Sequence, residues 1–208
     1  SLHRSTIHMT PSRGASPGWL VAGKRAARLM FHARGVAVLN SDEVVHQLLE
    51  DETVRTSIEA SLGTGPLPAV EEGRRRLAEI VFTNDEMLDR LEAIIFPLVA
   101  AEIERWLDTP DVAAAPLAVI ELSMLFEAGM EAGFDKVVLV TAPEEIRQLR
   151  HEGRVGLTDF ERRSSRQLPE AEKRTLSNYT FENTGSPEQL DEFVDATVAA
   201  IIAEGAAG

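Results

Sequence analysis

The sequence predicts an α/β protein built on a parallel sheet that helices cover on both faces. Two short apolar runs, Leu117–Ile120 and Val137–Val140, have strand length and no polar alternation, which is typical of parallel strands buried on both faces. Loop and helix signals follow each run, so strands and helices alternate along the chain. This alternation predicts a doubly wound sheet in which helices connect parallel strands.

The remaining helices and strands are predicted from residues that begin or end helices and from the spacing of apolar residues. Residues 24–34 suit a helix, and Gly35 then introduces a third apolar run, Val36–Leu39. We expect further helices over 41–50, 70–82, 84–107 and 187–203, another opening at Pro143, and a short strand at 179–181. Because the stretch of about 52–107 is almost purely helical, we expect it to form a helical insertion between strands.

Length and composition fit one globular domain. At 208 residues the chain can bury a sizeable core, and we expect the domain to span 18–208. Residues 1–17 contain Ser, Thr, Pro and Gly without periodicity, which indicates a disordered tail or a cloning artefact. The chain has no cysteine and no apolar run near the ~20 residues of a membrane span. We therefore expect a cytoplasmic protein without disulfides.

Net charge limits the partners of the chain. A formal charge of −13 argues against broad binding to nucleic acid or to an anionic membrane, since both need a basic face. Residues 147–166 are the exception, with six arginines against three acids. This stretch predicts an arginine-rich lid, about 150–168, that attracts a polyphosphate; the alternative is a solvated helix face of ion pairs.

A phosphate-loop pattern near the start of the predicted domain is incomplete. Gly18 to Lys24 matches Gly-x4-Gly-Lys, but Arg25 stands where a Ser or Thr hydroxyl would ligate Mg²⁺. Arginine has no acceptor atom, so Arg25 cannot ligate a cation, although it can bond phosphate oxygens. Bulky residues at 19–21 allow a second interpretation, in which Trp19–Ala22 is a strand and no phosphate cradle forms. In a third, residues before about Lys24 reflect an altered reading frame or a cloning tail.

Several further motifs occur in a fixed order. The first is Gly23-Lys24-Arg25-Ala26, which is followed by the predicted helix and strand and then by Asn40-Ser41-Asp42. The later motifs are Arg74, Leu77, Val81 and Phe82; Phe96-Pro97; Leu122–Glu127; Arg154–Thr158; Arg163–Gln167 with Pro169 and Lys173; and Asn183–Ser186. Taken together, their order and spacing resemble the dephospho-coenzyme A kinases, small P-loop kinases of coenzyme A biosynthesis. The resemblance runs from Gly18 to about Val194.

The resemblance implies an enzyme that uses ATP and Mg²⁺ to phosphorylate the ribose 3′-hydroxyl of dephospho-coenzyme A. It also implies a P-loop NTPase-like fold and a small-molecule partner. The implied catalytic residues are Asp42 as the base, Lys24 and Arg154. Gly18, Gly23, Lys24, Arg25, Arg154, Arg163, Asn183 and Gly185 would bind the nucleotide, and Asp42, Arg74, Phe96 and Glu127 would face the acceptor substrate. No residue is assigned to the metal.

Departures from the family pattern define the alternatives. Arg25, Ala26, Asn40, Phe96, Ser123, Val155 and Asn178 differ from it, whereas apolar positions such as Leu77, Phe82 and Leu125 persist. This distribution is consistent with a catalytically impaired homologue that binds nucleotide and has a non-enzymatic binding role. A kinase for another small nucleoside or nucleotide is a third hypothesis. Each candidate also has an ordinary structural role; Asp42, for example, would be a helix N-cap.

Overall fold

The computed structural model describes residues 5–11, 20–68, 70–122, 125–126, 129–141, 168–184 and 186–207. They fall into two compact units. One contains a parallel sheet with its helices, and the other contains the helices between residues 41 and 106. Within these described ranges, no helix has the length and apolar character needed to span a membrane.

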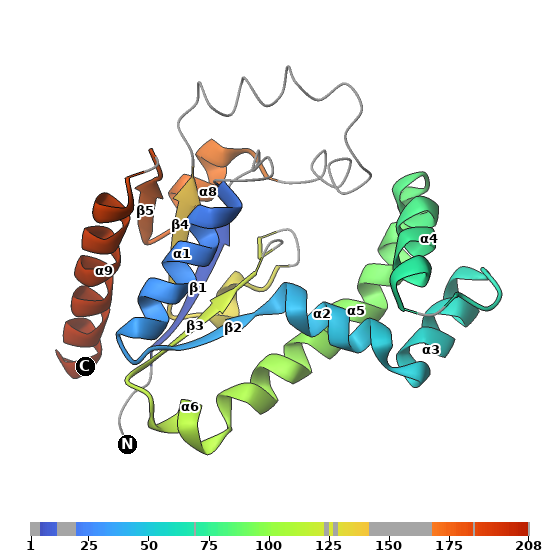
Figure 1. Ribbon diagram of the computed structural model, residues 1–208, viewed down its shortest axis with the longest axis horizontal. Helices are drawn as coiled ribbons and strands as arrows, with labels where there is room; N and C mark the ends of the chain where they lie inside the picture. Colours follow the sequence, from blue (N-terminus) through green and yellow to red (C-terminus); the bar gives the residue numbers. More distant parts are fainter. Residues whose placement is uncertain are drawn as a thin grey trace. The chain divides into compact units, whose positions relative to one another are not determined.

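The sheet has five strands, all parallel (Figure 1). They are β1 (Ser5–Pro11), β2 (Ala37–Asn40), β3 (Leu117–Glu121), β4 (Lys136–Thr141) and β5 (Tyr179–Glu182). Their order across the sheet is β2-β3-β1-β4-β5. The parallel sheet predicted from the sequence is confirmed, with strand bounds within two residues of those expected at four of the five strands.

β1 corrects the expectation of a disordered tail. Residues 5–11 occupy the centre of the sheet, where Ile7 pairs with Val119 of β3 and Lys136 of β4. The segment has few apolar residues, and this composition concealed the strand. A strand with a neighbour on each edge is stabilised by backbone hydrogen bonds on both sides, and such tertiary pairing overrides weak local preference.

The helix after β1 also differs from expectation at its start. α1 spans Leu20–Ala33, so it begins four residues before the predicted Lys24. The interpretation of Trp19–Ala22 as a strand is therefore wrong, because Leu20 is already helical. At its other end Gly35 has φ 72°, in the left-handed region that favours glycine. This turn leads directly into β2.

α1 and α9 (Pro187–Ala207) cover one face of the sheet (Figure 1). Phe31 of α1 and Val194 of α9 meet Val119 of β3 and Val138 of β4 in a cluster whose side chains are almost fully buried. Three short helices complete the described part of this unit: α6 (Pro110–Ala114), the 3-10 helix η1 (Glu131–Gly133) and α8 (Glu170–Leu176).

Ionic contacts fix both ends of α9. Near its start, the Arg34 guanidinium pairs with Asp191 at 2.8 Å and with Asp195, and these hydrogen bonds raise the pKa of Arg34. Near its end, Glu204 accepts a bond from Lys136 at 2.6 Å and from the Tyr179 hydroxyl at 3.1 Å. The Glu204 carboxylate raises the pKa of Lys136, and these two bonds lower the pKa of Glu204. Burial and then the bond to Glu204 raise the pKa of Tyr179.

These pKa shifts predict a pH window for the Glu204 contacts. Raised pKa values on Lys136 and Tyr179 mean that their contribution is present below about pH 10 and is lost as the pH rises through the folded-state pKa values. The lowered pKa of Glu204 means that its contribution is lost as the pH falls below about 4. We expect the difference in unfolding free energy between the wild type and Glu204→Gln to be largest near neutral pH. Urea unfolding at pH 3, 7 and 11 measures it, and a pH-independent difference would contradict these contacts.

The second unit is helical, as predicted for the insertion. It contains α2 (Ser41–Glu50), α3 (Glu52–Leu62), α4 (Val70–Phe82) and α5 (Asp85–Leu107). The Asn84 side chain caps α5 by accepting bonds from the backbone N–H groups of Glu86 and Met87, as expected. α3 is a separate helix that the sequence did not resolve. The Asp51 carboxylate caps it, accepting from the N–H of Thr53 at 2.8 Å.

Gly73 lets the segment before α4 lie against that helix. A Cβ atom at this position would lie closer to the Pro68 carbonyl oxygen than van der Waals contact allows. It would also approach the Leu67 side chain. Because the contacted atom belongs to the backbone, it cannot move aside as a flexible side chain would. The absence of a side chain at Gly73 therefore determines how closely residues 67–68 approach α4.

We predict that Gly73→Ala destabilises the protein by about 1–3 kcal/mol, partly offset by the ~1 kcal/mol gain in helix propensity. Gly133→Ala is the matched control, because a Cβ there has no atom within 4 Å. Urea unfolding of both variants measures the effect. Equal stability of the two variants would show that the approach of Pro68 imposes no constraint.

Candidate functional site

Polar residues gather where the parallel strands end. β2 ends at Asn40, β3 at Glu121, β4 at Thr141 and β5 at Glu182, and all these ends lie on the same edge of the sheet. Open α/β sheets bind ligands at the carboxyl ends of their strands. This edge is therefore the candidate functional site of the sheet unit.

Glu121 is the acidic residue at the centre of this edge. It is only 9% exposed, and it pairs in register with Asn40 on one side and with Met9 of β1 on the other. Glu121 was not predicted from the sequence as a site residue. The signal was present, because this carboxylate directly follows the apolar run Leu117–Ile120. A carboxylate is seldom buried unless polar groups or a cation compensate its charge.

Asn183 lies at the same edge, directly after β5. It is 4% exposed, and its backbone N–H donates to the carbonyl oxygen of Thr141 at 2.7 Å. This bond continues the pairing of β4 and β5 past the end of the strand, so Asn183 is held against the sheet. Its expected role beside the adenine stays a prediction.

The phosphate-loop residues are helical where the structure describes them. Gly23, Lys24 and Arg25 belong to α1, which begins at Leu20. In a helix the first four N–H groups lack partners within the helix, so those of residues 20–23 are available to an anion, whereas those of Lys24 and Arg25 reach carbonyls one turn back. The expected loop over 18–23 is therefore wrong for 20–23. Leu20 and Ala22 are good helix formers, and bulky residues disfavour the positive φ angles of a phosphate cradle.

In the helical unit, three predicted acceptor-side residues are described. Asp42 is exposed in the first turn of α2, which begins at Ser41, so Asp42 follows the cap position rather than occupying it. Arg74 is half-buried on α4 and pairs with Glu71 one turn earlier. Phe96 is half-buried on α5. Gly18, Glu127, Arg154, Arg163 and Gly185 lie outside the described residues, as does the lid from 150 to 167.

One departure from the family pattern lies away from the carboxyl edge. The Asn178 side-chain oxygen accepts a hydrogen bond from the Val137 N–H at 2.8 Å. The backbone N–H of Asn178 donates to the Val137 carbonyl oxygen at 2.9 Å. These bonds join the start of β4 to the start of β5, at the opposite edge from Glu121. Asn178 therefore has a structural role, and its departure from the family pattern is not evidence of impaired catalysis.

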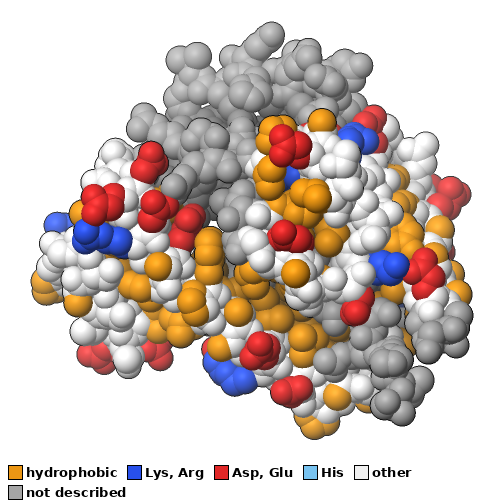
Figure 2. Space-filling model, turned by 180° about the vertical axis from the view of Figure 1, so that it is seen from behind, with side chains coloured by type: hydrophobic (Ala, Val, Ile, Leu, Met, Phe, Trp, Pro, Cys, Tyr) orange, Lys and Arg blue, Asp and Glu red, His pale blue; other side chains and the backbone are white. Residues whose placement is uncertain are grey.

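Neither a basic patch on the face of Figure 2 nor a cluster of metal ligands is formed by the described residues. On the face shown in Figure 2, the described Lys and Arg side chains lie singly among acidic and apolar ones. Among the described residues, no three His, Asp or Glu side chains form a group that could hold a metal ion. Mg²⁺ in phosphoryl-transfer sites is bound largely by phosphate oxygens and water, with one or two carboxylates. Glu121 supplies one carboxylate of that kind at the edge, so the residues present fit a phosphate-bound Mg²⁺.

The fold and its polar edge define a P-loop kinase-like α/β protein. Residues 17–189 match the family model described as dephospho-CoA kinase. The chain belongs to the dephospho-CoA kinase family. The whole of β2, β3, β4 and β5 and all four helices of the helical unit lie within the matched range, whereas β1 precedes it.

Individual proteins are also similar to this chain, both in sequence and in structure. The dephospho-CoA kinase of Brucella melitensis is 34% identical over 83% of this chain and 86% of its own length. That of Aquifex aeolicus is 34% identical over 83% of this chain and 88% of its own. The crystal structure of TT1252 from Thermus thermophilus is 31% identical, with a TM-score of 0.73, and covers 95% of this chain and 98% of its own. The dephospho-CoA kinase from Campylobacter jejuni, 21% identical over 96% of this chain and 98% of its own with a TM-score of 0.68, shares the fold.

Proposed function

We propose that this protein transfers the γ-phosphoryl group of ATP to the ribose 3′-hydroxyl of dephospho-coenzyme A in the cytoplasm. The observation that carries the proposal is the family match over residues 17–189, which includes both Lys24 and Asp42. The curated relatives with this name are matched over most of their length, which favours the complete activity.

Asp42 acts as the base in the proposed reaction. The ribose 3′-oxygen forms a bond to the γ-phosphorus while the bond from that phosphorus to the β–γ bridging oxygen breaks, and its electron pair leaves with ADP. The hydroxyl proton goes to the Asp42 carboxylate. Exposure in the first turn of α2 keeps this carboxylate accessible to a substrate.

Cationic side chains neutralise the transferred group. Lys24 is assigned to the β/γ oxygens, and Arg154 and Arg163 of the lid are assigned to the same phosphates, because a planar guanidinium bonds a phosphoryl edge with two N–H groups. Gly18, Gly23 and Arg25 would contact the nucleotide phosphates, and Asn183 and Gly185 would border the adenine. The burial of Asn183 against β4 and β5 supports a fixed position for its part of this site.

Mg²⁺ would supply charge neutralisation between the β- and γ-phosphates when it is bound. Among the described residues, Glu121 fits it, directly or through a water molecule, because its carboxylate ends the strand beside β1. Arg25 cannot replace the usual hydroxyl as a ligand. On the acceptor side, Arg74, Phe96 and Glu127 are assigned to dephospho-coenzyme A.

An assay of ADP formation that depends on dephospho-coenzyme A tests the proposal. We expect turnover by the wild type, and we expect Asp42→Asn to lower kcat by about 10²–10⁴-fold with little change in KM for ATP, because only the proton acceptor is lost. Glu43→Gln is the matched control, an adjacent exposed acid on the same helix turn, and it should retain activity.

If the protein is a catalytically impaired homologue, the same assay of ADP formation gives a different result. It predicts no turnover at millimolar Mg·ATP, and that outcome would reject the kinase proposal. The double variant Arg25→Ser with Ala26→Thr then shows whether the lost hydroxyl is the cause, since it should restore Mg²⁺-dependent turnover. Turnover with another nucleoside or nucleotide, but not with dephospho-coenzyme A, would indicate the third hypothesis.

Glu121→Gln tests the proposed metal contact. The substitution keeps the shape of the side chain and removes its charge, so we expect the Mg²⁺ concentration for half-maximal activity to rise by about tenfold, in line with the 10–100-fold effect typical of residues around a metal. Glu104→Gln removes one charge from an exposed position of α5 and serves as the control. Identical Mg²⁺ titrations for Glu121→Gln and the wild type would exclude Glu121 from the metal site.

A further inference from the structure

A small pocket lies inside the helical unit. Its lining comes from α2, α3, α4 and the segment before α4, and its cavity volume is about 10 Å³. Apolar side chains such as Leu49, Ile58 and Leu77 form most of the wall. Two arginines, Arg55 of α3 and Arg74 of α4, complete it. The pocket therefore combines an apolar wall with two arginine side chains from different helices.

Arg55 differs from Arg74, Arg90 and Arg105 of this unit, each of which pairs with an acidic residue of its own helix. Arg74 pairs with Glu71, and Arg90 pairs with Glu86 at 2.6 Å while also donating to the Ser61 carbonyl. Arg55 is half-buried, yet among the described residues its guanidinium has no carboxylate or carbonyl partner. In a chain of net charge −13, a half-buried cation with no acidic partner among the described residues is a candidate site for a bound anion.

The pocket lies along the same face of α2 as Asp42. Leu49 lines the pocket and follows Asp42 by seven residues, which corresponds to about two helical turns and places both residues on one side of α2. The axial separation is therefore roughly 10 Å. An acceptor whose hydroxyl approaches Asp42 can reach the pocket with a group that lies beyond its ribose ring.

We propose that Arg55, together with Arg74, binds the diphosphate of the acceptor substrate at this pocket. The inference rests on the proposed function, in which the acceptor is a nucleoside 5′-diphosphate ester whose 3′-hydroxyl meets Asp42. A volume of about 10 Å³ holds one water-sized group. One phosphate oxygen enters the pocket, and the rest of the diphosphate lies at its mouth, where two guanidiniums provide paired N–H donors. Arg55 is then a specificity residue that recognises the acceptor by its charge.

Steady-state kinetics with two acceptors tests this assignment. We expect Arg55→Ala to raise KM for dephospho-coenzyme A by about tenfold or more, the effect of one hydrogen bond to a charged group. kcat and KM for ATP should stay within about twofold, and Arg55→Lys should restore part of the affinity. Adenosine, which lacks the diphosphate, should be used equally poorly by the wild type and by Arg55→Ala.

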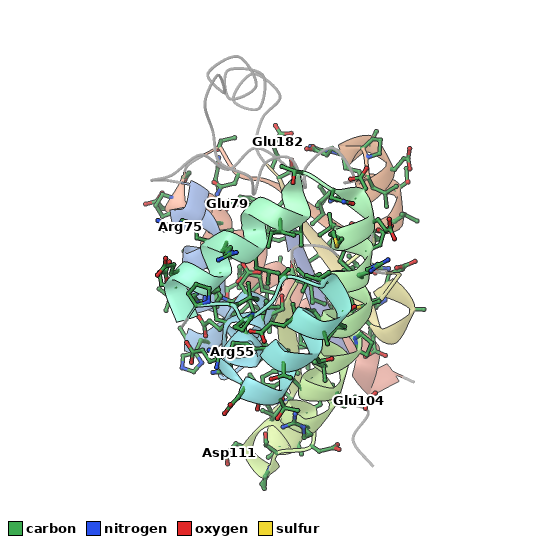
Figure 3. All side chains as sticks on the ribbon, turned by 90° about the vertical axis from the view of Figure 1, so that its right-hand side faces the viewer. Arg55, Arg75, Glu79, Glu104, Asp111 and Glu182 are labelled. Carbon is green, nitrogen blue, oxygen red and sulfur yellow. The ribbon has the colours of Figure 1, made fainter. Side chains whose placement is uncertain are left out.

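Arg75→Ala is the matched control. Arg75 follows Arg74 on α4, is exposed and does not line the pocket, and Figure 3 shows it apart from Arg55. Its loss removes the same charge from the unit, so an equal rise in KM for Arg75→Ala would attribute the effect to general electrostatics and overturn the proposal. Arg55→Gln, which keeps the apolar stem, replaces Arg55→Ala in the comparison if thermal unfolding shows that the Ala variant is not folded.

Calorimetric titration with dephospho-coenzyme A alone separates this inference from the proposed function. Tenfold weaker binding by Arg55→Ala supports the pocket assignment even if the wild type has no kinase activity, which would reject only the function. Normal turnover with an unchanged KM and unchanged binding in Arg55→Ala would reject only the pocket. Absence of binding to the wild type, with no turnover, would reject both.

Discussion

The structure depends on the backbone pairing of β1 with strands on both of its sides. β1 joins β3 on one edge and β4 on the other, so it connects the β2–β3 pair to the β4–β5 pair. Because every pairing is parallel, the carboxyl ends of all five strands fall on one edge, and Asn40, Glu121 and Thr141 are brought there together. The central strand β1 thus brings the ends of four strands that are distant in the sequence to one polar edge.

A second constraint is the packing of α1 and α9 over one face of the sheet. Phe31 and Val194 are almost fully buried against the strands, and removal of such apolar surface from water is the main stabilising contribution. The ion pairs of Arg34 and Glu204 lie at the two ends of this contact and are partly exposed, so each contributes modestly. These ion pairs fix the position of α9 along the sheet, whereas the burial of apolar side chains supplies most of the stability of the contact.

The candidate site shows which features were predictable from the sequence. Buried strands were found because Leu117–Ile120 and Val137–Val140 are apolar without alternation, and the cap at Asn84 was found because its side chain acts locally. β1 was missed because its stability comes from neighbours more than 100 residues away in the sequence. Glu121 was missed for a related reason, since its importance depends on its position beside β1 rather than on a motif. Asn178 was counted among the departures from the family pattern, yet its side chain binds the start of β4.

The sequence by itself determined the alternation of strands and helices, the spacing from Lys24 to Asp42 and the family to which these motifs belong. These features are local or rest on distances along the chain, and the residue order contains them directly. Tertiary structure decided the central place of β1, the helical start of α1 at Leu20 and the meeting of Arg55 with Arg74 at one pocket. Each of these depends on contacts between segments distant in sequence, where backbone pairing and burial outweigh local preference.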